Sequence, residues 1–290
     1  MTTEPKDTIG QITSLYTEGD LNGLRKHLLH STAWIQHQQT SYGEDQITRM
    51  WMTWLANCGL SSCEERVVIR NDDQSFLLLS LLPEKGNNEV RLGFWAWHNE
   101  KYIKRMLCQV DTSLMHSATG LDESALLEML PAPNPLVIGD YDQQEHPHHV
   151  DVEPGDLASL GDQVAPVLKG WWTLWQHEQL ANISRYYAED ALIQLPGMTG
   201  SASHLDLLSY CSDWFMRLTR RFCQPESVIY DSENPESVAV LWHMEGDMPA
   251  ANGIRRVRIP VINLLKITDG RIQRDTMLTD PLALQKCLQA

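Results

Sequence analysis

Positive charge is scarce in this chain of 290 residues: 23 Lys and Arg residues stand against 38 Asp and Glu residues, which gives a formal net charge of -15. Proteins that bind nucleic acid neutralise its phosphates with clustered Lys and Arg side chains. The charge balance argues against such a surface, so we expect no nucleic-acid partner.

Long hydrophobic runs are also missing. No stretch approaches the roughly 20 apolar residues that a membrane-spanning helix requires. The opening residues, MTTEPKDTIG, lack the apolar core of a secretory signal. We therefore expect a soluble, cytoplasmic protein with no membrane partner.

Cysteine is sparse for a chain of this length. The chain has six, and two of them, Cys58 and Cys63, lie too far apart for the C-x-x-C spacing of a zinc site. Six cysteines also do not make a disulfide scaffold of 290 residues. We interpret them as reduced thiols.

The chain does contain an internal sequence repeat. KYIKRMLCQVD, residues 101–111, resembles GRIQRDTMLTD, residues 270–280, and SFLLLSLL (75–82) parallels SVAVLWHM (237–244). The matches keep their order and the insertions fall in expected surface turns, which indicates a domain duplication. The alignment pairs Ile103 with Ile272, Arg105 with Arg274, Asp111 with Asp280, Ile35 with Ile193 and Gln36 with Gln194.

Each copy places helices before strands. In residues 162–176 apolar side chains recur at intervals of three and four, which predicts an amphipathic helix. A strand at 191–195, a helix at 204–218 and four strands between 223 and 279 follow. The first copy has the same order, with a helix from about Thr8 and four strands ending at Asp111. This order indicates an α+β fold with a mostly antiparallel sheet.

The second copy carries the clearest resemblance to a known family. YYAEDALIQLPGMTGSASHLDLL (186–208), followed by strands and closed by DGRIQRDTMLTDPLAL (269–284), resembles the SnoaL-like branch of the nuclear transport factor 2-like superfamily. SYGEDQITRMW (41–51) resembles the same helix entry in the first copy. The resemblance implies tandem cone-shaped domains of cystatin-like fold, each with N-terminal helices packed on a curved sheet.

We accordingly expect three segments. Residues 1–115 form a divergent nuclear transport factor 2-like domain, residues 116–159 form a linker with a short helix capped by Asp122, and residues 160–290 form the SnoaL-like domain. In the linker, His146, His148 and His149 beside acidic residues could hold a metal. A solvated polar linker is the alternative that we favour, and we expect neither a metal nor a cofactor.

SnoaL-like cyclases resemble ketosteroid isomerase in relying on a carboxylate. The resemblance places that carboxylate at Met277, or Cys108 in the first copy, and neither can act as a base. The isomerase-type position falls near Leu195, beside Gln194. These departures count against the familiar proton-transfer mechanism.

Asp275 is the remaining candidate, because it shares a strand face with Met277. Burial in a pocket would raise its pKa and suit it to acid–base catalysis. The other interpretation, which we favour, is a surface ion pair with nearby arginines, namely Arg256, Arg258, Arg271 and Arg274.

Three further polar side chains have two interpretations each. His243, which shares a strand face with Glu245, could shuttle protons, but we favour an exposed position on the sheet. We favour the same for His37. Asn263 lies within an apolar strand, where it either makes a buried hydrogen bond, the favoured reading, or meets a ligand.

Ten tryptophans suit either the walls of a pocket for a flat, apolar ligand or an ordinary core. Trp95 and Trp97 share a strand face and could form an apolar patch on the sheet. Such faces could pair the two copies as an intramolecular pseudo-dimer, or two chains as a homodimer. The residues expected to line the ligand pocket are Trp172, Trp175, Gln194, Trp214, Asn263 and Met277. The other tryptophans expected to face inwards are Trp51, Trp54, Trp171 and Trp242.

Three functions stay open. The first is binding of a small, largely apolar molecule in a SnoaL-like pocket of the second domain. The second is a cofactor-independent cyclase, isomerase or dehydratase that uses Asp275, with His243 as a further candidate. The third is a non-catalytic interaction or assembly module, whose tryptophans fill the space of a ligand. The sequence does not decide whether the protein is an enzyme.

Overall fold

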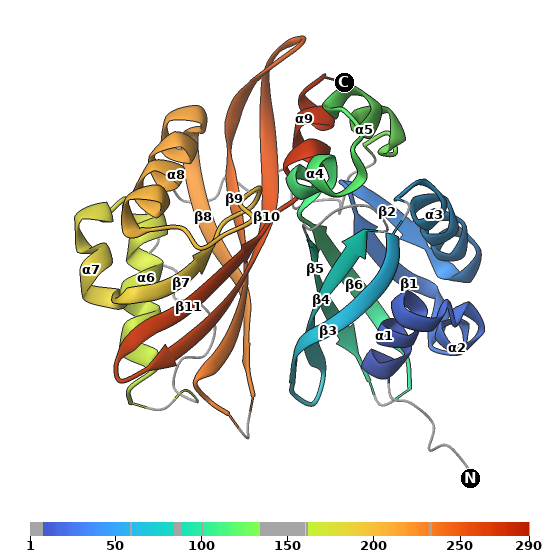
Figure 1. Ribbon diagram of the computed structural model, residues 1–290, viewed down its shortest axis with the longest axis horizontal. Coiled ribbons are helices and arrows are strands. Elements are labelled where there is room, and N and C mark those ends of the chain that lie inside the picture. The colour runs from blue at the N-terminus through green and yellow to red at the C-terminus, as the bar shows by residue number, and fades with distance from the viewer. Residues whose placement is uncertain are drawn as a thin grey trace. The chain divides into compact units, whose positions relative to one another are not determined.

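The computed structural model describes residues 8–58, 60–83, 89–99, 101–133, 160, 162–231 and 234–289. The chain divides into two compact units (Figure 1). The first unit is Met1–Asn134 with Asp280–Ala283, and the second is Pro135–Thr279 with Leu284–Ala290. Most of the expected linker lies outside the described residues, so its boundaries stay predictions.

The first unit contains a six-stranded sheet with the order β2-β1-β6-β5-β4-β3. Only β1 and β6 run parallel, and every other neighbouring pair is antiparallel. Its strands are β1 (Leu28–Gln36), β2 (Gln39–Tyr42), β3 (Leu60–Arg70), β4 (Gln74–Pro83), β5 (Val90–His98) and β6 (Ile103–Val110). Its helices are α1 (Thr8–Glu18), α2 (Leu21–Arg25), α3 (Gly43–Cys58), η1 (Thr112–Leu114), α4 (Met115–Thr119) and α5 (Glu123–Met129).

The second unit contains a five-stranded sheet with the order β7-β11-β10-β9-β8. Helices α6, α7 and α8 lie along one face of this sheet in Figure 1. Its strands are β7 (Tyr187–Gln194), β8 (Thr219–Tyr230), β9 (Ser237–Ala250), β10 (Gly253–Thr268) and β11 (Arg271–Leu278). Its helices are α6 (Ala165–Gln176), η3 (Leu180–Asn182), α7 (Ile183–Tyr186) and α8 (His204–Arg217), and α9 (Pro281–Gln289) begins in residues that belong to the first unit.

Local sequence signals explain where several helices begin. Ser203 and Asp206 form a capping box at the start of α8, with hydrogen bonds in both directions. The Asp122 side chain accepts from the Ala125 N–H at 2.8 Å and caps α5, so the expected short helix is present. Pro166 lies in the first turn of α6, where its missing N–H costs no helical hydrogen bond.

The two sheets repeat one topology. The order β1-β6-β5-β4-β3 matches β7-β11-β10-β9-β8, and the parallel pair is β1 with β6 in one sheet and β7 with β11 in the other. The predicted α+β class with mostly antiparallel sheets is confirmed. The shared order is what a duplication predicts. Strand β2, which the sequence did not predict, has as its counterpart an isolated bridge between Ile193 and Ala202.

The strand pairing corrects the alignment of the two copies by one residue in two places. Trp34 pairs with Met106, and Ile193 pairs with Asp275. If Met106 is equivalent to Asp275, as the closing-strand match requires, then Trp34 rather than Ile35 corresponds to Ile193. Trp34 and Ile193 are both fully buried in their cores. A slip of one residue exchanges the two faces of a strand, so the corrected register decides which side chains are equivalent.

The same reasoning moves the match between β4 and β9. Leu77 pairs with Phe94 and Phe94 with Cys108, while Val240 pairs with Asn263 and Asn263 with Met277. Inward-facing residues of β1 and β4 thus have counterparts one position away from the sequence alignment, whereas the closing-strand match of β6 with β11 is unchanged. The equivalent pairs include Leu28 with Tyr187, Leu79 with Trp242, Phe94 with Asn263 and Met106 with Asp275.

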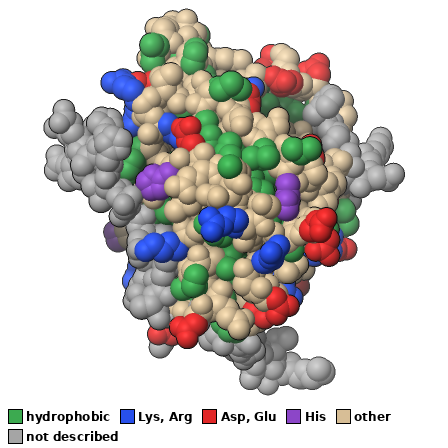
Figure 2. Space-filling view, turned by 90° about the vertical axis from the view of Figure 1, so that its left-hand side faces the viewer, with side chains coloured by type: hydrophobic (Ala, Val, Ile, Leu, Met, Phe, Trp, Pro, Cys, Tyr) green, Lys and Arg blue, Asp and Glu red, His purple; other side chains and the backbone are tan. Residues whose placement is uncertain are grey.

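No helix within the described residues combines the length and the apolar character that crossing a membrane requires. Figure 2 shows one face of the molecule, on which hydrophobic and charged side chains of both signs are interspersed. The large hydrophobic side chains that are exposed in the second unit include Leu192, Leu205, Met216 and Ile254.

Candidate functional site: a buried carboxylate in the second unit

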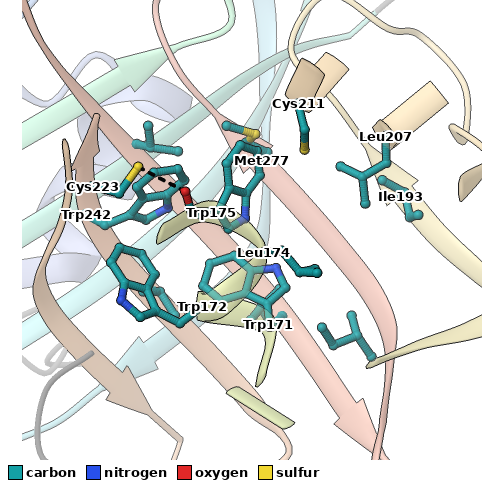
Figure 3. Close-up of a cluster of buried hydrophobic side chains, with 14 of the residues drawn as sticks. Trp171, Trp172, Leu174, Trp175, Ile193, Leu207, Cys211, Cys223, Trp242 and Met277 are labelled. Carbon is teal, nitrogen blue, oxygen red and sulfur yellow. Dashed lines mark hydrogen bonds between the residues drawn. The ribbon is translucent and has the colours of Figure 1, made fainter. Parts of the chain in front are cut away.

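Four tryptophans form the centre of the second unit's core. Helix α6 contributes Trp171, Trp172 and Trp175, which are at most 2% exposed, and strand β9 contributes Trp242. The ring of Trp242 lies 6.4, 5.5 and 4.9 Å from those of Trp171, Trp172 and Trp175, centroid to centroid (Figure 3). The helical spacing of the three α6 residues places them on the face that packs on the sheet.

Strand β11 places Asp275 in this core, where it is 1% exposed. The Tyr187 hydroxyl donates a hydrogen bond to its Oδ2 at 2.5 Å. The Asn263 amide Nδ2 donates to its Oδ1 at 2.7 Å. Tyr187 lies on β7 and Asn263 on β10, the two strands that flank β11, so the sheet itself brings the three side chains together.

Two indoles fix the direction of these hydrogen bonds. Trp171 Nε1 donates to the Tyr187 oxygen at 2.9 Å, and Trp242 Nε1 donates to Asn263 Oδ1 at 2.8 Å. An indole N–H can only donate. The Asn263 amide must therefore turn its NH2 group towards Asp275. The Tyr187 oxygen accepts from Trp171 and donates its own hydrogen to the Asp275 carboxylate, which can only accept when it is ionised. We call Trp171, Tyr187, Asp275, Asn263 and Trp242 the carboxylate network; both arms end on Asp275 as the acceptor.

The environment of Asp275 shifts its ionisation in opposing ways. Burial raises the pKa of Asp275 from 3.8 to about 6, although the hydrogen bonds from Tyr187 and Asn263 lower it. Burial and the nearby Asp275 carboxylate raise the pKa of Tyr187 well above its usual range. Asp275 is thus the member of the network that gains and loses a proton near neutral pH, as acid–base chemistry requires.

The cysteines of this core do not offer a nucleophile. Burial raises the pKa of the Cys223 thiol to about 11, and burial together with Asp275 raises the pKa of Cys211 further. Thiols of this kind stay protonated near neutral pH. Neither thiol is therefore a candidate nucleophile near neutral pH.

The first unit replaces the network with apolar side chains. By strand pairing, Met106 takes the place of Asp275, Leu28 that of Tyr187, Phe94 that of Asn263 and Leu79 that of Trp242. All four lie in the buried core of the first unit. The fold therefore does not require a polar group at any of these positions.

The structure overturns the surface ion pair that the sequence favoured for Asp275. Arg256 and Arg258 instead lie within 3.8 and 3.3 Å of the Glu245 carboxylate. Arg271 and Arg274 are exposed on β11, whereas Asp275 points inwards. Alternation along the strand puts Arg274 on the face opposite Asp275, and the pairing of β11 with both neighbouring strands shifts register between Arg271 and Asp275.

The other expected pocket residues have three different surroundings. Asn263 makes the buried hydrogen bonds that the favoured interpretation predicted. Gln194 does not join the network. Its strand partner Thr276 lies on the face opposite Asp275, and the Thr276 hydroxyl donates to Gln194 Oε1 at 2.8 Å. The expected pocket residues that belong to the same buried core as the Trp cluster are Trp172, Trp175, Trp214 and Met277.

His243 and His37 are buried, so the exposed positions favoured for them are wrong. His243 is 5% exposed, with Nε2 3.2 Å from Glu226 and Nδ1 3.4 Å from an Arg258 nitrogen. It follows Trp242 in β9 and so faces away from the carboxylate network. His37 is 4% exposed and lies in the turn between β1 and β2.

The expected tryptophan patch of the first unit is also corrected. Trp95 is fully buried and donates to Gln74 Oε1 at 2.9 Å. Trp97 is half-buried, with the Arg105 guanidinium 4.4 Å from its ring centroid. Pairing through sheet faces stays a prediction. The side chain of Trp54 lies outside the described residues.

Among the described residues, no group of three or more His, Cys, Asp and Glu side chains is placed to hold a metal ion. His146, His148 and His149 lie outside the described part of the chain. Sequence reasoning missed Tyr187; it placed Trp171 and Trp242 among the inward-facing residues but did not predict their hydrogen bonds. No spacing rule signals Tyr187, because it reaches Asp275 only through the parallel pairing of β7 with β11.

No family model matches the sequence, and no curated protein matches it. Solved structures do match. A candidate polyketide cyclase from Bacillus cereus is 18% identical over 44% of this chain and 83% of its own, with a TM-score of 0.37.

A candidate SnoaL-like polyketide cyclase from Jannaschia is 14% identical over 46% of this chain and 95% of its own, with a TM-score of 0.38. IdmH, a candidate polyketide cyclase from Streptomyces antibioticus, is 16% identical over 43% of this chain and 98% of its own, with a TM-score of 0.37. These matches concern fold over less than half of the chain, and no activity follows from them.

Proposed function

We propose that the second unit binds a small, largely apolar molecule whose polar group meets Asp275. The supporting observation is the carboxylate network, one ionisable group held by oriented donors among apolar side chains. Binding sites for small molecules combine apolar walls with a few placed polar groups in this way. The residues nearest the ligand would be Trp172, Trp175, Asn263 and Met277.

The energetic argument is that Asp275 destabilises the folded protein at neutral pH. A rise in pKa from 3.8 to about 6 corresponds to about 3 kcal/mol of stability lost when the group is ionised. The first unit avoids this loss with Met106 in the equivalent position. A destabilising group that the fold does not need is typical of a functional site.

Proton transfer by Asp275 is the second candidate function, and the pKa near 6 favours it. A carboxyl group with this pKa can take a proton from a carbon next to a carbonyl and return it without a cofactor. Such a reaction would be of the isomerase, cyclase or dehydratase kind. Incubation with carbonyl compounds in heavy water would reveal it as deuterium in the recovered compound, lost in Asp275→Asn.

Binding can be tested by Trp fluorescence and thermal melting with flat, apolar compounds such as naphthols and naphthyl ketones. The parent should show a saturable change in fluorescence and a raised melting temperature. Asp275→Asn should lose most of this response. Asp269→Asn is the matched control, because Asp269 is exposed in the turn before β11 and its positive φ of 53° suits asparagine.

Two results would count against the proposal. A parent that responds to no compound would favour the interaction module, in which the four packed Trp rings are simply core. A response that survives in Asp275→Asn would place the binding site elsewhere.

A further inference from the structure

Five carboxylate side chains are buried among the residues that the structure describes. They are Asp111, Glu245, Asp247, Asp275 and Asp280. A carboxylate loses its hydration when it is buried, and buried charges in proteins are therefore paired with an opposite charge. The partners of these five side chains show how the chain balances charge in its interior.

Both carboxylates buried in the first unit have a basic partner. Arg91 Nη2 lies 2.7 Å from Asp111 Oδ2. His37 Nδ1 lies 2.5 Å from Asp280 Oδ2, and Asp280 belongs to the first unit. The side chains of both pairs are at most 4% exposed. The first unit thus holds its buried carboxylates in pairs.

The second unit pairs two of its three buried carboxylates in the same way. Arg258 Nε lies 3.3 Å from Glu245 Oε1, and Arg256 Nη1 lies 3.4 Å from Asp247 Oδ1. Asp275 is the exception, because no Lys, Arg or His side chain in the described part of the chain forms an ion pair with it. It is also the carboxylate that the proposed site is built around.

The groups around Asp275 do not balance its charge. Its hydrogen-bond partners Tyr187 and Asn263 are neutral donors. The pKa values of Tyr187 and of Cys211, the titratable group that α8 places nearby, are raised, so both stay protonated and uncharged near neutral pH. The basic ring of His204 lies 6.0 Å from that of Tyr187, centroid to centroid, and its Nε2 donates to a backbone carbonyl at 2.9 Å.

The oxygens of Asp275 can still accept hydrogen bonds. Oδ1 accepts from Asn263 and Oδ2 from Tyr187, whereas an ionised carboxylate has about four acceptor positions. A polar group that reaches Asp275 in its ionised form must therefore be a donor. An anion would meet a like charge in surroundings that water does not screen.

The surroundings of Asp275 suit a ligand with an apolar body. Trp171, Trp175 and Met277 belong to one buried cluster (Figure 3). Asp275 is 1% exposed, so a ligand reaches it only when neighbouring side chains move. Met277, two residues along the same strand face, has an unbranched side chain that adapts readily. An ion pair formed here is stronger than one at the surface, because the local dielectric constant is lower.

We propose that the ligand of the second unit is an organic cation: an apolar molecule whose protonated amine pairs with the ionised carboxylate of Asp275. This inference rests on the proposed function and narrows its ligand class. The net charge of -15 attracts cations at long range. A metal ion fits the site less well, because within the described residues Asp275 belongs to no group of three His, Cys, Asp or Glu side chains placed to bind one.

The test compares three compounds that share one apolar body. Naphthylmethylamine is a cation at about pH 7.5, naphthylmethanol is neutral and naphthoate is an anion. Isothermal titration calorimetry of the full chain gives the dissociation constant of each. The amine should bind at least about tenfold more tightly than the alcohol, as a desolvated ion pair predicts, and naphthoate should bind least tightly.

Two variants assign this preference to one carboxylate. Asp275→Asn should weaken binding of the amine more than binding of the alcohol, so that the advantage of the amine disappears. Asp269→Asn removes an exposed carboxylate from the turn before β11 and should keep the advantage. Both variants lower the net negative charge equally, so the comparison separates a local ion pair from long-range attraction.

The pH dependence of the parent gives a second readout, which serves if Asp275→Asn does not fold. The pKa of Asp275 is about 6, so at about pH 5 the carboxyl group is mostly protonated and the advantage of the amine should shrink. A bound cation favours the ionised form. With saturating amine, the NMR titration midpoint of Asp275 should therefore fall by about one pH unit or more, whereas the alcohol should not lower it.

The outcomes separate this inference from the proposed function. Equal affinities for the amine and the alcohol near neutral pH, with both weakened in Asp275→Asn, would overturn the cation and leave the binding site in place. An advantage that persists in Asp275→Asn, or that Asp269→Asn removes equally, would overturn it as well, since the charge of the whole chain would then explain it. If none of the three compounds binds, the proposed function fails and the cation fails with it.

Discussion

Tyr187 and Asp275 lie 88 residues apart in the chain and share a hydrogen bond of 2.5 Å in the core of the second unit. The bond forms because the first and last strands of the unit, β7 and β11, run side by side in parallel. The Trp171 indole, which donates to the Tyr187 oxygen, leaves the hydroxyl hydrogen free to point at the carboxylate. Core packing from α6 thus sets the hydrogen-bond pattern around the one carboxyl group of the network.

Stability should depend on pH through Asp275. Its pKa is about 6 in the folded protein against an ordinary value of 3.8, so the folded state holds the proton more tightly. The contribution of this group to stability is complete below pH 3.8 and is lost as the pH rises through 6. Urea unfolding at several pH values should show the parent losing about 3 kcal/mol relative to Asp275→Asn between about pH 4 and 7. A constant difference between the two proteins would mean that Asp275 is not shifted, and Asp269→Asn provides the baseline.

Removal of the Tyr187 hydroxyl should raise the pKa of Asp275 further. Tyr187→Phe deletes a donor to the carboxylate and leaves the Trp171 N–H without its acceptor. We expect a loss of about 1–3 kcal/mol in the free energy of unfolding, together with a higher Asp275 titration midpoint. NMR titration and urea unfolding measure the two effects. The neighbouring change Tyr186→Phe is the control, and an equal effect there would show that the hydroxyl of Tyr187 is not special.

A carboxylate placed at the equivalent position of the first unit should be poorly tolerated. Met106 has Leu28 and Phe94 where Asp275 has Tyr187 and Asn263, so Met106→Asp would bury a charge without these donors. We expect a loss of at least about 3 kcal/mol at pH 7 that shrinks at acidic pH, where the new group is neutral. Met106→Leu, measured alongside by urea unfolding, should cost less than about 1.5 kcal/mol. Equal losses for the two variants at pH 7 would refute the equivalence of Met106 and Asp275.

The end of α9 should depend on Arg255. The Arg255 guanidinium donates to the Cys287 carbonyl oxygen, and the Ala251 N–H donates to that of Leu288 at 2.9 Å. Arg255→Ala removes a partner of the last helical turn. Hydrogen exchange in residues 284–289 should increase several-fold, while Arg274→Ala on the exposed face of β11 should leave it unchanged. Exchange that does not respond to Arg255→Ala would show that the hydrogen bond contributes little.

Register is the main feature that the sequence left open. Matching letters aligned Ile35 with Ile193, whereas strand pairing and burial make Trp34 the equivalent residue. Two residues of similar type score well in an alignment even when one faces the core and the other faces the opposite side of the strand. The hydrogen-bond ladder has no such freedom, because one residue of slip would turn the core side chains outwards.

The sequence by itself determined the class of fold: the helical period of α6, the order of helices and strands, and the repeat of that order in two copies. These signals are local or are repeated along the chain, so they survive without knowledge of contacts. Burial at single polar positions was decided only by the tertiary structure, which placed Asp275, His243 and His37 inside although an exposed position was favoured for each. Their partners come from distant segments, as with His37 and Asp280, 243 residues apart. A polar residue is stable inside only if donors or acceptors converge on it, and that convergence exists only once the chain has folded.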